Sequence, residues 1–517
     1  MSRCLNLSTF WKHANFEGHI SKRYLIPAFI EYAIVIGITT ALSFVLDSTL
    51  GTKSTDDISA KWTIDTFVML FTGFIPNFVI TLTGKSIGTK NPRIVGNSLL
   101  IHCGIALAFS VLLIVLALPL RVPCCRLLGM SNELISKTKW YYIIEFCITP
   151  LTFIAATLNS VMTSYWWFAF ALGKDLLNML VTWVTFYLCH VRFHLGLTGA
   201  ALVTAVPVIV TVPIMIVYIL CRKPERPLYT FPWQKQTKEP ESASLLNFSE
   251  SNLRASVVGA ELHTINPTVA RISSPNTQKR EKQKYARLYA KAFLILFSTS
   301  VTLTVGRMIS NSFALKAPSE YGNLKSTTPG LQSYAIMIMN NIVSIPMTAS
   351  GIISSLCLAI ATPLLSKNSL KSTKYVQRMY FVLTILSFAI GVICAIVYAC
   401  LGYTRFISSF IQPADVPLVS AFSKLIWPFG MAISVMWCLL GVFRAFTLSS
   451  TSFKSFFLAE VISLIIFYPM VLVGGTTRFG SVLPVCFWLA LAETVRVFSL
   501  TAGHLTITLR NVKNTRK

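Results

Sequence analysis

The chain has 517 residues, of which 54% are hydrophobic and 12% are charged, and its formal net charge is +26. This composition excludes an ordinary soluble globular protein, because such proteins carry about 25% charged residues. Several apolar runs exceed ~18 residues, the length that crosses a bilayer as a helix. The sequence therefore predicts an integral, multi-pass membrane protein. We expect no nucleic-acid partner, because the basic charge is not gathered into a basic domain or an RNA-reading motif.

In chain order, the apolar runs predict twelve transmembrane helices in two groups of six. The first run is too long for the core of a signal peptide, and no small-residue cleavage site follows it. The expected spans are 25–46, 63–84, 96–119, 140–164, 176–190, 199–220, 292–315, 331–361, 379–401, 421–443, 455–473 and 484–503.

A polar segment divides the two groups of spans. Residues 222–288 are rich in Ser, Thr, Pro, Lys and Glu and show no sustained apolar periodicity, which is typical of a disordered linker. The expected divisions are an N-terminal tail at 1–24, a six-helix bundle at 25–221, the linker at 222–288, a second bundle at 289–505 and a C-terminal tail at 506–517.

Orientation follows from the basic residues, because cytoplasmic loops carry an excess of Lys and Arg. Most of the 45 Lys and Arg residues fall in the loops that share a side with both termini. We therefore expect both termini in the cytoplasm, the plasma membrane rather than an organelle, and basic loops close to anionic lipid. We expect a monomer. The twelve cysteines are scattered, and no Cys/His cluster has the spacing of metal ligands.

The two halves repeat several features in the same order. A short basic loop follows the second span of each half, at 84–95 and at 366–376. Each half also places a proline inside the span after its third exterior loop, at Pro150 and at Pro428. Because both halves start on the same side with an even number of spans, the repeat is parallel, about an axis along the membrane normal.

Four stretches resemble the multidrug and toxic compound extrusion (MATE) family. "RYLIPAF" (23–29) begins the first span, "GKSIGTKNPRIV" (84–95) follows the second, "LLGMSNELISKTKWYYII" (127–144) leads into the fourth, and "GLTGAALVTAV" (196–206) opens the sixth. The resemblance covers roughly 22–221 and, more loosely, 292–505. It implies an all-α polytopic membrane protein, with twelve transmembrane helices in two six-helix bundles related by pseudo-two-fold symmetry. A central cavity would open alternately to either side.

The chain departs from the family pattern at its charged residues. Many prokaryotic members carry a coupling aspartate in the first span, closer to the early proline than Asp47, which lies twenty residues after Pro27 at the outer end of the span. Other members use carboxylates in the seventh and tenth spans. Here those spans carry Arg307 and Lys424 and no acid. The sign of the charge is reversed at both places.

A polar stripe surrounds Arg307. The stripe consists of Ser300, Thr304, Arg307 and Asn311. These residues are spaced by four, three and four positions, so they share one face of a helix. Polar stripes in membrane helices face a bundle interior or a cavity, or they serve close helix packing. For Arg307, the alternative to lining a cavity is an ion pair with an acid on another helix. Lys424 would either bind substrate or extend to the interface. The substrate and cavity candidates are Arg307, Thr304, Asn311, Asn341, Ser344 and Lys424.

Three acidic residues are candidates for ion coupling: Glu31, Asp47 and Glu145. A carboxyl group in a low-dielectric interior can carry a proton. We expect no cofactor, with H⁺ or Na⁺ as the coupling ion. Glu493 and Arg496 are i,i+3 neighbours and are expected to pair with each other in a structural role.

We expect a transporter rather than an enzyme, because the sequence has no H-E-x-x-H or G-x-S-x-G motif and no ATP-binding domain. The leading hypothesis is a secondary active transporter that exports a small-molecule organic solute. The family prior favours cationic drugs, whereas Arg307 favours an anion. The alternatives are an exporter of organic or phosphate-bearing anions, as in the progressive-ankylosis family, and a lipid-linked sugar flippase. A structural or receptor-like protein is not favoured by the paired six-span plan.

Overall fold

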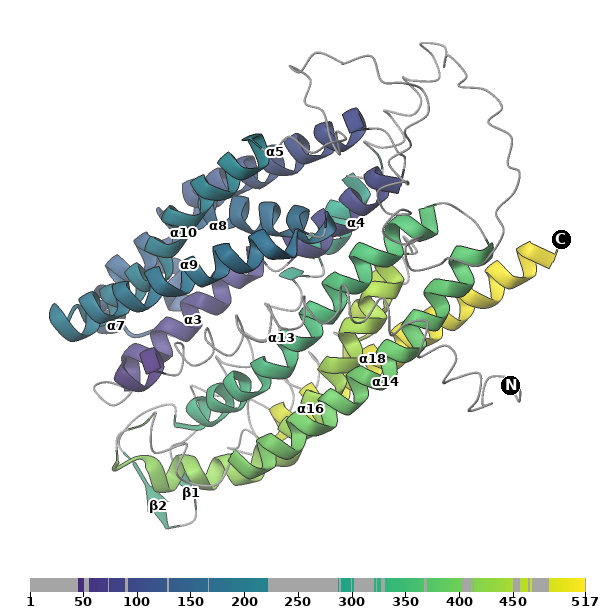
Figure 1. Cartoon of the computed structure of the whole chain (residues 1–517). Helices are drawn as coiled ribbons and strands as arrows, with labels where there is room; N and C mark the ends of the chain where they lie inside the picture. Colours follow the sequence, from purple (N-terminus) through teal and green to yellow (C-terminus); the bar gives the residue numbers. More distant parts are fainter. Residues whose placement is uncertain are drawn as a thin grey trace.

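We describe the protein from a computed structural model of the chain (Figure 1). The structure describes residues 45–50, 55–72, 74–88, 92–127, 130–165, 167–221, 287, 290–298, 300–301, 320–321, 323–326, 331–366, 370–401, 411, 413–449, 456–463, 465–466 and 483–516. The statements below concern these residues.

The described part of the first half is helical throughout. Its elements are α3 (Thr55–Thr72), α4 (Ile75–Gly88), α5 (Pro92–Ala117), α6 (Arg121–Leu127), α7 (Asn132–Lys137), α8 (Lys139–Ser164), α9 (Phe168–Phe186), the π-helix η2 (Tyr187–Arg192) and α10 (Gly196–Cys221).

The described part of the second half adds four long helices and a small hairpin. Its labelled elements are β1 (Glu320–Tyr321), β2 (Leu324–Lys325), α13 (Leu331–Ser366), α14 (Leu370–Leu401), α16 (Val416–Ser449) and α18 (Leu483–Arg516). The strands are antiparallel, with Glu320 opposite Lys325 and Tyr321 opposite Leu324. Figure 1 shows the first half, in purple to teal, beside the second half, in green to yellow.

The helices are long enough to cross a membrane. Within the described residues, six helices contain an apolar window of the required length and composition, namely Gly96–Ala117, Lys139–Ser164, Gly196–Cys221, Val376–Val397, Val416–Ser449 and Cys486–Gly503. The all-α, multi-pass class predicted from the sequence is confirmed. Residues 25–44 of the first expected span and most of 292–315 lie outside the described residues.

Two boundaries differ from the sequence prediction in an informative way. The second span, expected to begin at residue 63, begins at Thr55 and consists of α3 and α4. Hydropathy misses its first turns because they contain acidic residues and Lys61, whose charge is paired inside the fold.

The fifth span, expected at 176–190, runs as α9 from Phe168 and continues as η2. The chain then turns at Gly196, whose φ of 55° is a conformation that favours glycine.

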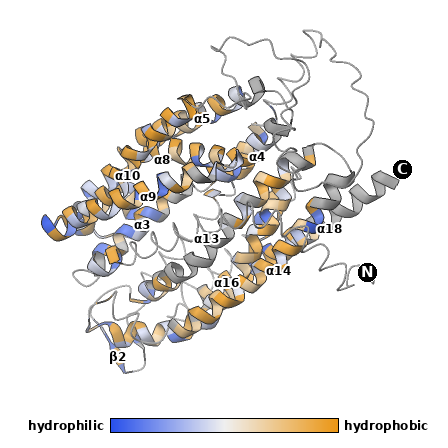
Figure 2. Cartoon of the chain, in the orientation of Figure 1, coloured by the Kyte–Doolittle hydropathy of each residue, from blue (hydrophilic) through white to orange (hydrophobic). Residues whose placement is uncertain are grey.

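The outer faces of the helices are apolar. Figure 2 shows hydrophobic residues along α5, α10 and α14. On α14, large apolar side chains are exposed at Phe381, Ile385, Phe388, Ile393 and Ile396. Such a surface would be an aggregation risk in water, and it suits a lipid environment.

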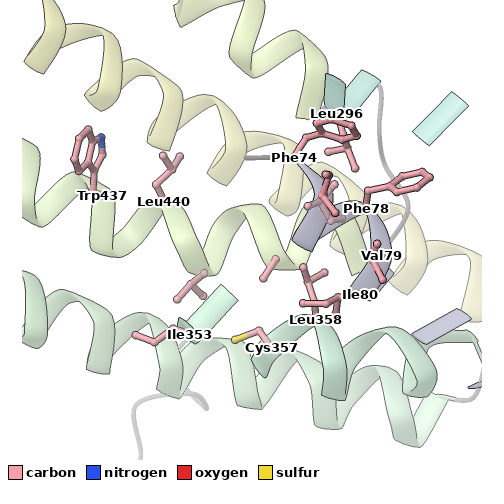
Figure 3. Packing of buried hydrophobic residues seen from close by; sticks show 14 of the residues in the cluster. Phe74, Phe78, Val79, Ile80, Leu296, Ile353, Cys357, Leu358, Trp437 and Leu440 are labelled. Atoms are coloured by element: carbon pink, nitrogen blue, oxygen red, sulfur yellow. The ribbon is translucent and has the colours of Figure 1, made fainter. Parts of the chain in front are cut away.

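The two halves meet in one large apolar core. We call the side on which α10 and α18 end the linker side, and the side that carries β1 and β2 the hairpin side. Toward the linker side, α4 packs against α13. Figure 3 shows Val79 and Ile80 of α4 in the same buried cluster as Leu358 of α13. A second core lies on the hairpin side and is formed only by first-half residues between Leu46 and Val203, among the residues that the structure describes.

Aromatic rings reinforce the contact between the halves. The helical segment 290–298 places Phe293 and Phe297 against the first half, where Phe74 and Phe109 meet both rings edge to face. The ring centroids are 5.1 Å apart for Phe109 and Phe297 and 5.3 Å apart for Phe74 and Phe293. Edge-to-face pairs each contribute about 0.5–1.5 kcal/mol beyond area burial.

One glycine sets a close helix contact within the second half. A methyl group at Gly391 of α14 would lie 2.9 Å from the Cα of Val435 and 3.3 Å from the Cβ of Cys438, both on α16. The absent side chain therefore allows the two backbones to approach, as small residues do between membrane helices.

We predict that Gly391→Ala destabilises the protein by about 1–3 kcal/mol, the usual cost of overpacking. The measurement is the midpoint of thermal unfolding of purified protein in detergent. Gly104→Ala is the matched control, because a methyl group there would meet nothing within 4 Å and alanine favours a helix. Equal shifts for the two variants would contradict the assigned packing.

Candidate functional site

A buried charge network lies in the hairpin-side part of the first half. We call it the Lys61 network, and it is built around one ammonium group and three carboxyl groups. Its members are Asp47, Lys61, Trp62, Asp65, Tyr141, Glu145 and Thr204. Charges in such a position are costly unless they are paired, so each contact constrains what the site can bind.

Lys61 sits between two aspartates. Its Nζ atom is 3.2 Å from Oδ1 of Asp47 and 3.1 Å from Oδ2 of Asp65. The side chains of Lys61 and Asp47 are 7% and 1% exposed, so this pair is shielded from solvent. The second oxygen of Asp47 accepts a hydrogen bond of 2.9 Å from Nε1 of Trp62.

Asp65 is the more accessible of the two aspartates, with 28% of its side chain exposed. Its Oδ1 atom accepts a hydrogen bond from the hydroxyl group of Tyr141, which is fully buried on α8. Asp65 and Lys61 are i,i+4 neighbours on α3, a spacing that places oppositely charged side chains side by side. Asp65 thereby connects α3 to α8.

Glu145 lies one turn after Tyr141 on α8 and is also buried. Its Oε1 atom accepts a hydrogen bond of 2.6 Å from the hydroxyl group of Thr204 on α10. Asp65 and Lys61 are the charged groups that act on this carboxyl group electrostatically. No salt bridge to Glu145 is present among the described residues.

The charge balance defines what this network can do. With all its acids ionised, the described members of the network carry three negative charges and one positive charge. This excess of negative charge favours protons or a cation over an anion. Within the described part of the chain, no group of three acidic, histidine or cysteine side chains could hold a metal ion.

A second buried charge network joins three helices of the second half. We call it the Arg496 network, and it consists of Arg444 on α16, Glu460 in the helical segment 456–463, and Glu493 and Arg496 on α18. Glu460 lies 2.8 Å from Nη2 of Arg444 and 2.7 Å from Nε of Arg496.

Arg496 completes the chain of pairs. Its Nη1 atom donates to both oxygens of Glu493, at 2.7 and 2.6 Å. The predicted contact between Glu493 and Arg496 is therefore present, and Glu460 extends it. Two positive and two negative charges make the network neutral, which is the arrangement expected of a structural tie between helices.

The structure divides the candidate residues from the sequence into three groups. Asp47 and Glu145 are brought into the Lys61 network. Lys424 lies on the hairpin-side part of α16 with its side chain exposed. Asn341 and Ser344 lie on α13, and their side chains are not described. The remaining candidates, Glu31, Thr304, Arg307 and Asn311, lie outside the described residues.

Sequence reasoning missed five members of the two networks: Lys61, Trp62, Tyr141, Thr204 and Arg444. The i,i+4 pair of Lys61 and Asp65 and the i,i+4 pair of Tyr141 and Glu145 were available as signals. The expected spans 63–84 and 421–443 leave Lys61 and Arg444 just outside the apolar windows. Both helices extend further than those windows.

Comparison with known proteins supports the family resemblance. Residues 27–193 match the MatE family model. No curated protein matches the chain. The resemblance to the MATE family is therefore confirmed on the first half of the sequence.

Solved structures extend the likeness to nearly the whole chain. An outward-facing multidrug resistance MATE family transporter of the MOP superfamily has a TM-score of 0.65 at 13% identity, covering 95% of this chain and 96% of that one. An inward-facing structure of such a transporter has a TM-score of 0.56 at 12% identity, covering 96% and 100%. The two-bundle MATE fold is thereby confirmed.

A third structure differs in the polarity of its binding pocket. It is a MOP superfamily transporter from Pyrococcus furiosus Vc1 (DSM3638), for which a reverse polarity of the binding pocket suggests a different function. Its TM-score is 0.65 at 12% identity, and the match covers 94% of this chain and 95% of that one. At such identities the likeness concerns the fold.

We predict that Glu460→Gln destabilises the protein by about 3–5 kcal/mol, because it removes one charge from a buried network and leaves two guanidinium groups without it. Thermal or denaturant unfolding of the purified protein measures this. Glu320→Gln is the control, because Glu320 pairs with Lys325 at the exposed hairpin, where a salt bridge contributes about 0–1 kcal/mol. A loss below 1 kcal/mol for Glu460→Gln would contradict the structural role.

Proposed function

We propose that this chain, whose residues 27–193 match the MatE family and whose fold is that of MATE transporters, is a secondary active transporter. It exports a small organic solute by alternating access, in exchange for protons, across the plasma membrane. The observation that carries the proposal is the buried carboxyl group of Glu145, which, among the described residues, is held by a hydroxyl group rather than by a cation.

The three carboxyl groups of the Lys61 network have different partners. Asp47 and Asp65 both contact Lys61, so their charges are compensated by a cation of the chain itself. Among the described side chains, Glu145 is bonded by Thr204. A buried carboxylate without its own cation is stabilised when it takes up a proton, because the proton removes a charge from the interior. Glu145 is therefore the member suited to exchange a proton.

Thr204 couples the protonation state of Glu145 to the neighbouring helix α10. Its hydroxyl oxygen is 2.6 Å from Oε1 of Glu145 and 2.8 Å from the carbonyl oxygen of Ala201. One hydroxyl group has one proton to donate. When Glu145 is ionised, Thr204 donates to it. When Glu145 is protonated, its own O–H donates to Thr204, and the threonine proton turns to Ala201.

This exchange of donors joins α8 and α10 to the protonation state. A ligand shifts a conformational equilibrium only by the difference between its affinities for the two states. A proton on Glu145 meets that requirement if the distance to Thr204 changes between the outward-facing and inward-facing forms. Protonation of Glu145 would then favour one of the two forms, and the substrate would leave from the other form. Protons and substrate would thereby be exchanged.

We predict that Glu145→Gln abolishes transport driven by a pH gradient, with at least a tenfold loss of rate, because glutamine resembles the protonated acid and cannot release a proton. The measurement is efflux of a labelled organic cation from proteoliposomes with an imposed pH difference and a pH-sensitive dye inside. Glu133→Gln is the control, since Glu133 is exposed on α7. Unchanged proton-coupled efflux in Glu145→Gln would end the assignment.

A second candidate is the export of organic or phosphate-bearing anions. Two observations favour it: Arg307 with its polar stripe in the seventh span, and the fold shared with a transporter whose pocket has reverse polarity. A guanidinium group binds carboxylate and phosphate through two parallel hydrogen bonds. The flippase for lipid-linked sugars has no such support in the described residues.

We predict that, if the substrate is an anion, Arg307→Ala lowers anion efflux from proteoliposomes at least tenfold while the protein remains folded. The control is Arg126→Ala, because Arg126 is exposed on α6. A panel of cationic dyes and organic anions is assayed side by side. If the cations move in exchange for protons and Arg307→Ala has no effect on this movement, the anion-export hypothesis is rejected and the cation-export hypothesis is retained.

A further inference from the structure

The contacts around Lys61 account for every oxygen of the two aspartates beside it. One oxygen of each aspartate contacts Nζ of Lys61, at 3.2 Å for Asp47 and 3.1 Å for Asp65. The other oxygen of Asp47 accepts from Trp62, and the other oxygen of Asp65 accepts from Tyr141. All four oxygens are therefore engaged by donors that belong to the chain.

These two aspartates would otherwise form an attractive position for a metal cation. Hard cations bind carboxylate oxygens, and two carboxylates that approach one point from different helices suit them well. Here the point is taken by the ammonium group of Lys61, which has the same charge as an alkali-metal ion. It cannot leave, because it is part of α3.

We infer that Lys61 is a tethered cation that occupies the position of a free Na⁺ ion between Asp47 and Asp65 and keeps alkali-metal ions out of the Lys61 network. Lys61 is thus a determinant of ion specificity. It explains why a network with an excess of negative charge would exchange protons rather than sodium. The consequence for coupling rests on the proposed function, whereas the exclusion of sodium concerns binding alone.

The charge balance of the network predicts the effect of removing the ammonium group of Lys61. Lys61→Met keeps much of the length of the side chain and removes the ammonium group. Asp47 and Asp65 then lose the ammonium group that both of them contact, and like charges repel more strongly in a low dielectric than in water. A Na⁺ ion with water can replace the lost charge. The variant should gain a sodium dependence that the wild-type protein lacks.

The test compares the full-length proteins, purified in detergent at fixed pH, by thermal unfolding with NaCl replaced stepwise by choline chloride at constant ionic strength. We expect no Na⁺-specific change in the midpoint for the wild type. Lys61→Met should show a saturable rise with Na⁺, as a ligand that binds the folded state requires. The rise should be lost in the double variant Lys61→Met/Asp47→Asn. Lys61→Arg, which keeps the charge, should resemble the wild type.

Two results would overturn the inference. One is a saturable Na⁺ response of the wild-type protein that Asp47→Asn removes. The other is a monodisperse, cooperatively unfolding Lys61→Met that shows no Na⁺ response. If Lys61→Met does not fold, Lys61→Gln takes its place. If neither folds, the wild-type arm decides, since a response removed by Asp47→Asn overturns the inference and its absence supports it. Loss of proton coupling in Glu145→Gln is a separate readout, so failure of the proposed function remains distinguishable.

Discussion

The ion pairs of Lys61 with Asp47 and Asp65 are the interaction on which the hairpin-side part of the first half depends. A helix can carry charges into an apolar bundle only if other helices bring partners to meet them. That condition allows α3 to begin at Thr55, about two turns earlier than an apolar window would allow. It also fixes α3 against α8 through Tyr141 and so places Glu145 beside α10.

In both buried networks, charges on one helix meet partners on other helices, but the two networks differ in net charge. The Arg496 network is neutral and ties α16, the segment 456–463 and α18 together, so it has no reason to exchange charge with the solvent. The Lys61 network retains an excess of negative charge. Among the described residues, Glu145 is the acid of this network that has no salt bridge. The two halves therefore differ in the charge balance of their described buried networks.

The sequence was sufficient for the class of fold and for local contacts. Apolar runs identified the spans, and the spacing of Glu493 and Arg496 predicted their pair. It was insufficient where partners come from different helices. Asp47 and Lys61 are fourteen residues apart on either side of a turn, and Glu145 and Thr204 are separated by most of two spans, so neither contact leaves a periodic trace. Helix ends were misplaced for the same reason, because hydropathy counts a paired charge as an exposed one.

The rings of Phe293 and Phe297 have a consequence for the integrity of the chain. They belong to the second half by sequence, yet they pack against Phe74 and Phe109 of the first. Because α4 and α13 add a further apolar contact, the described parts of the two halves are joined by packed apolar surfaces. Each half therefore carries its own share of the apolar contact, and we expect the halves, made as two separate polypeptides divided in the polar segment, to associate within the bilayer.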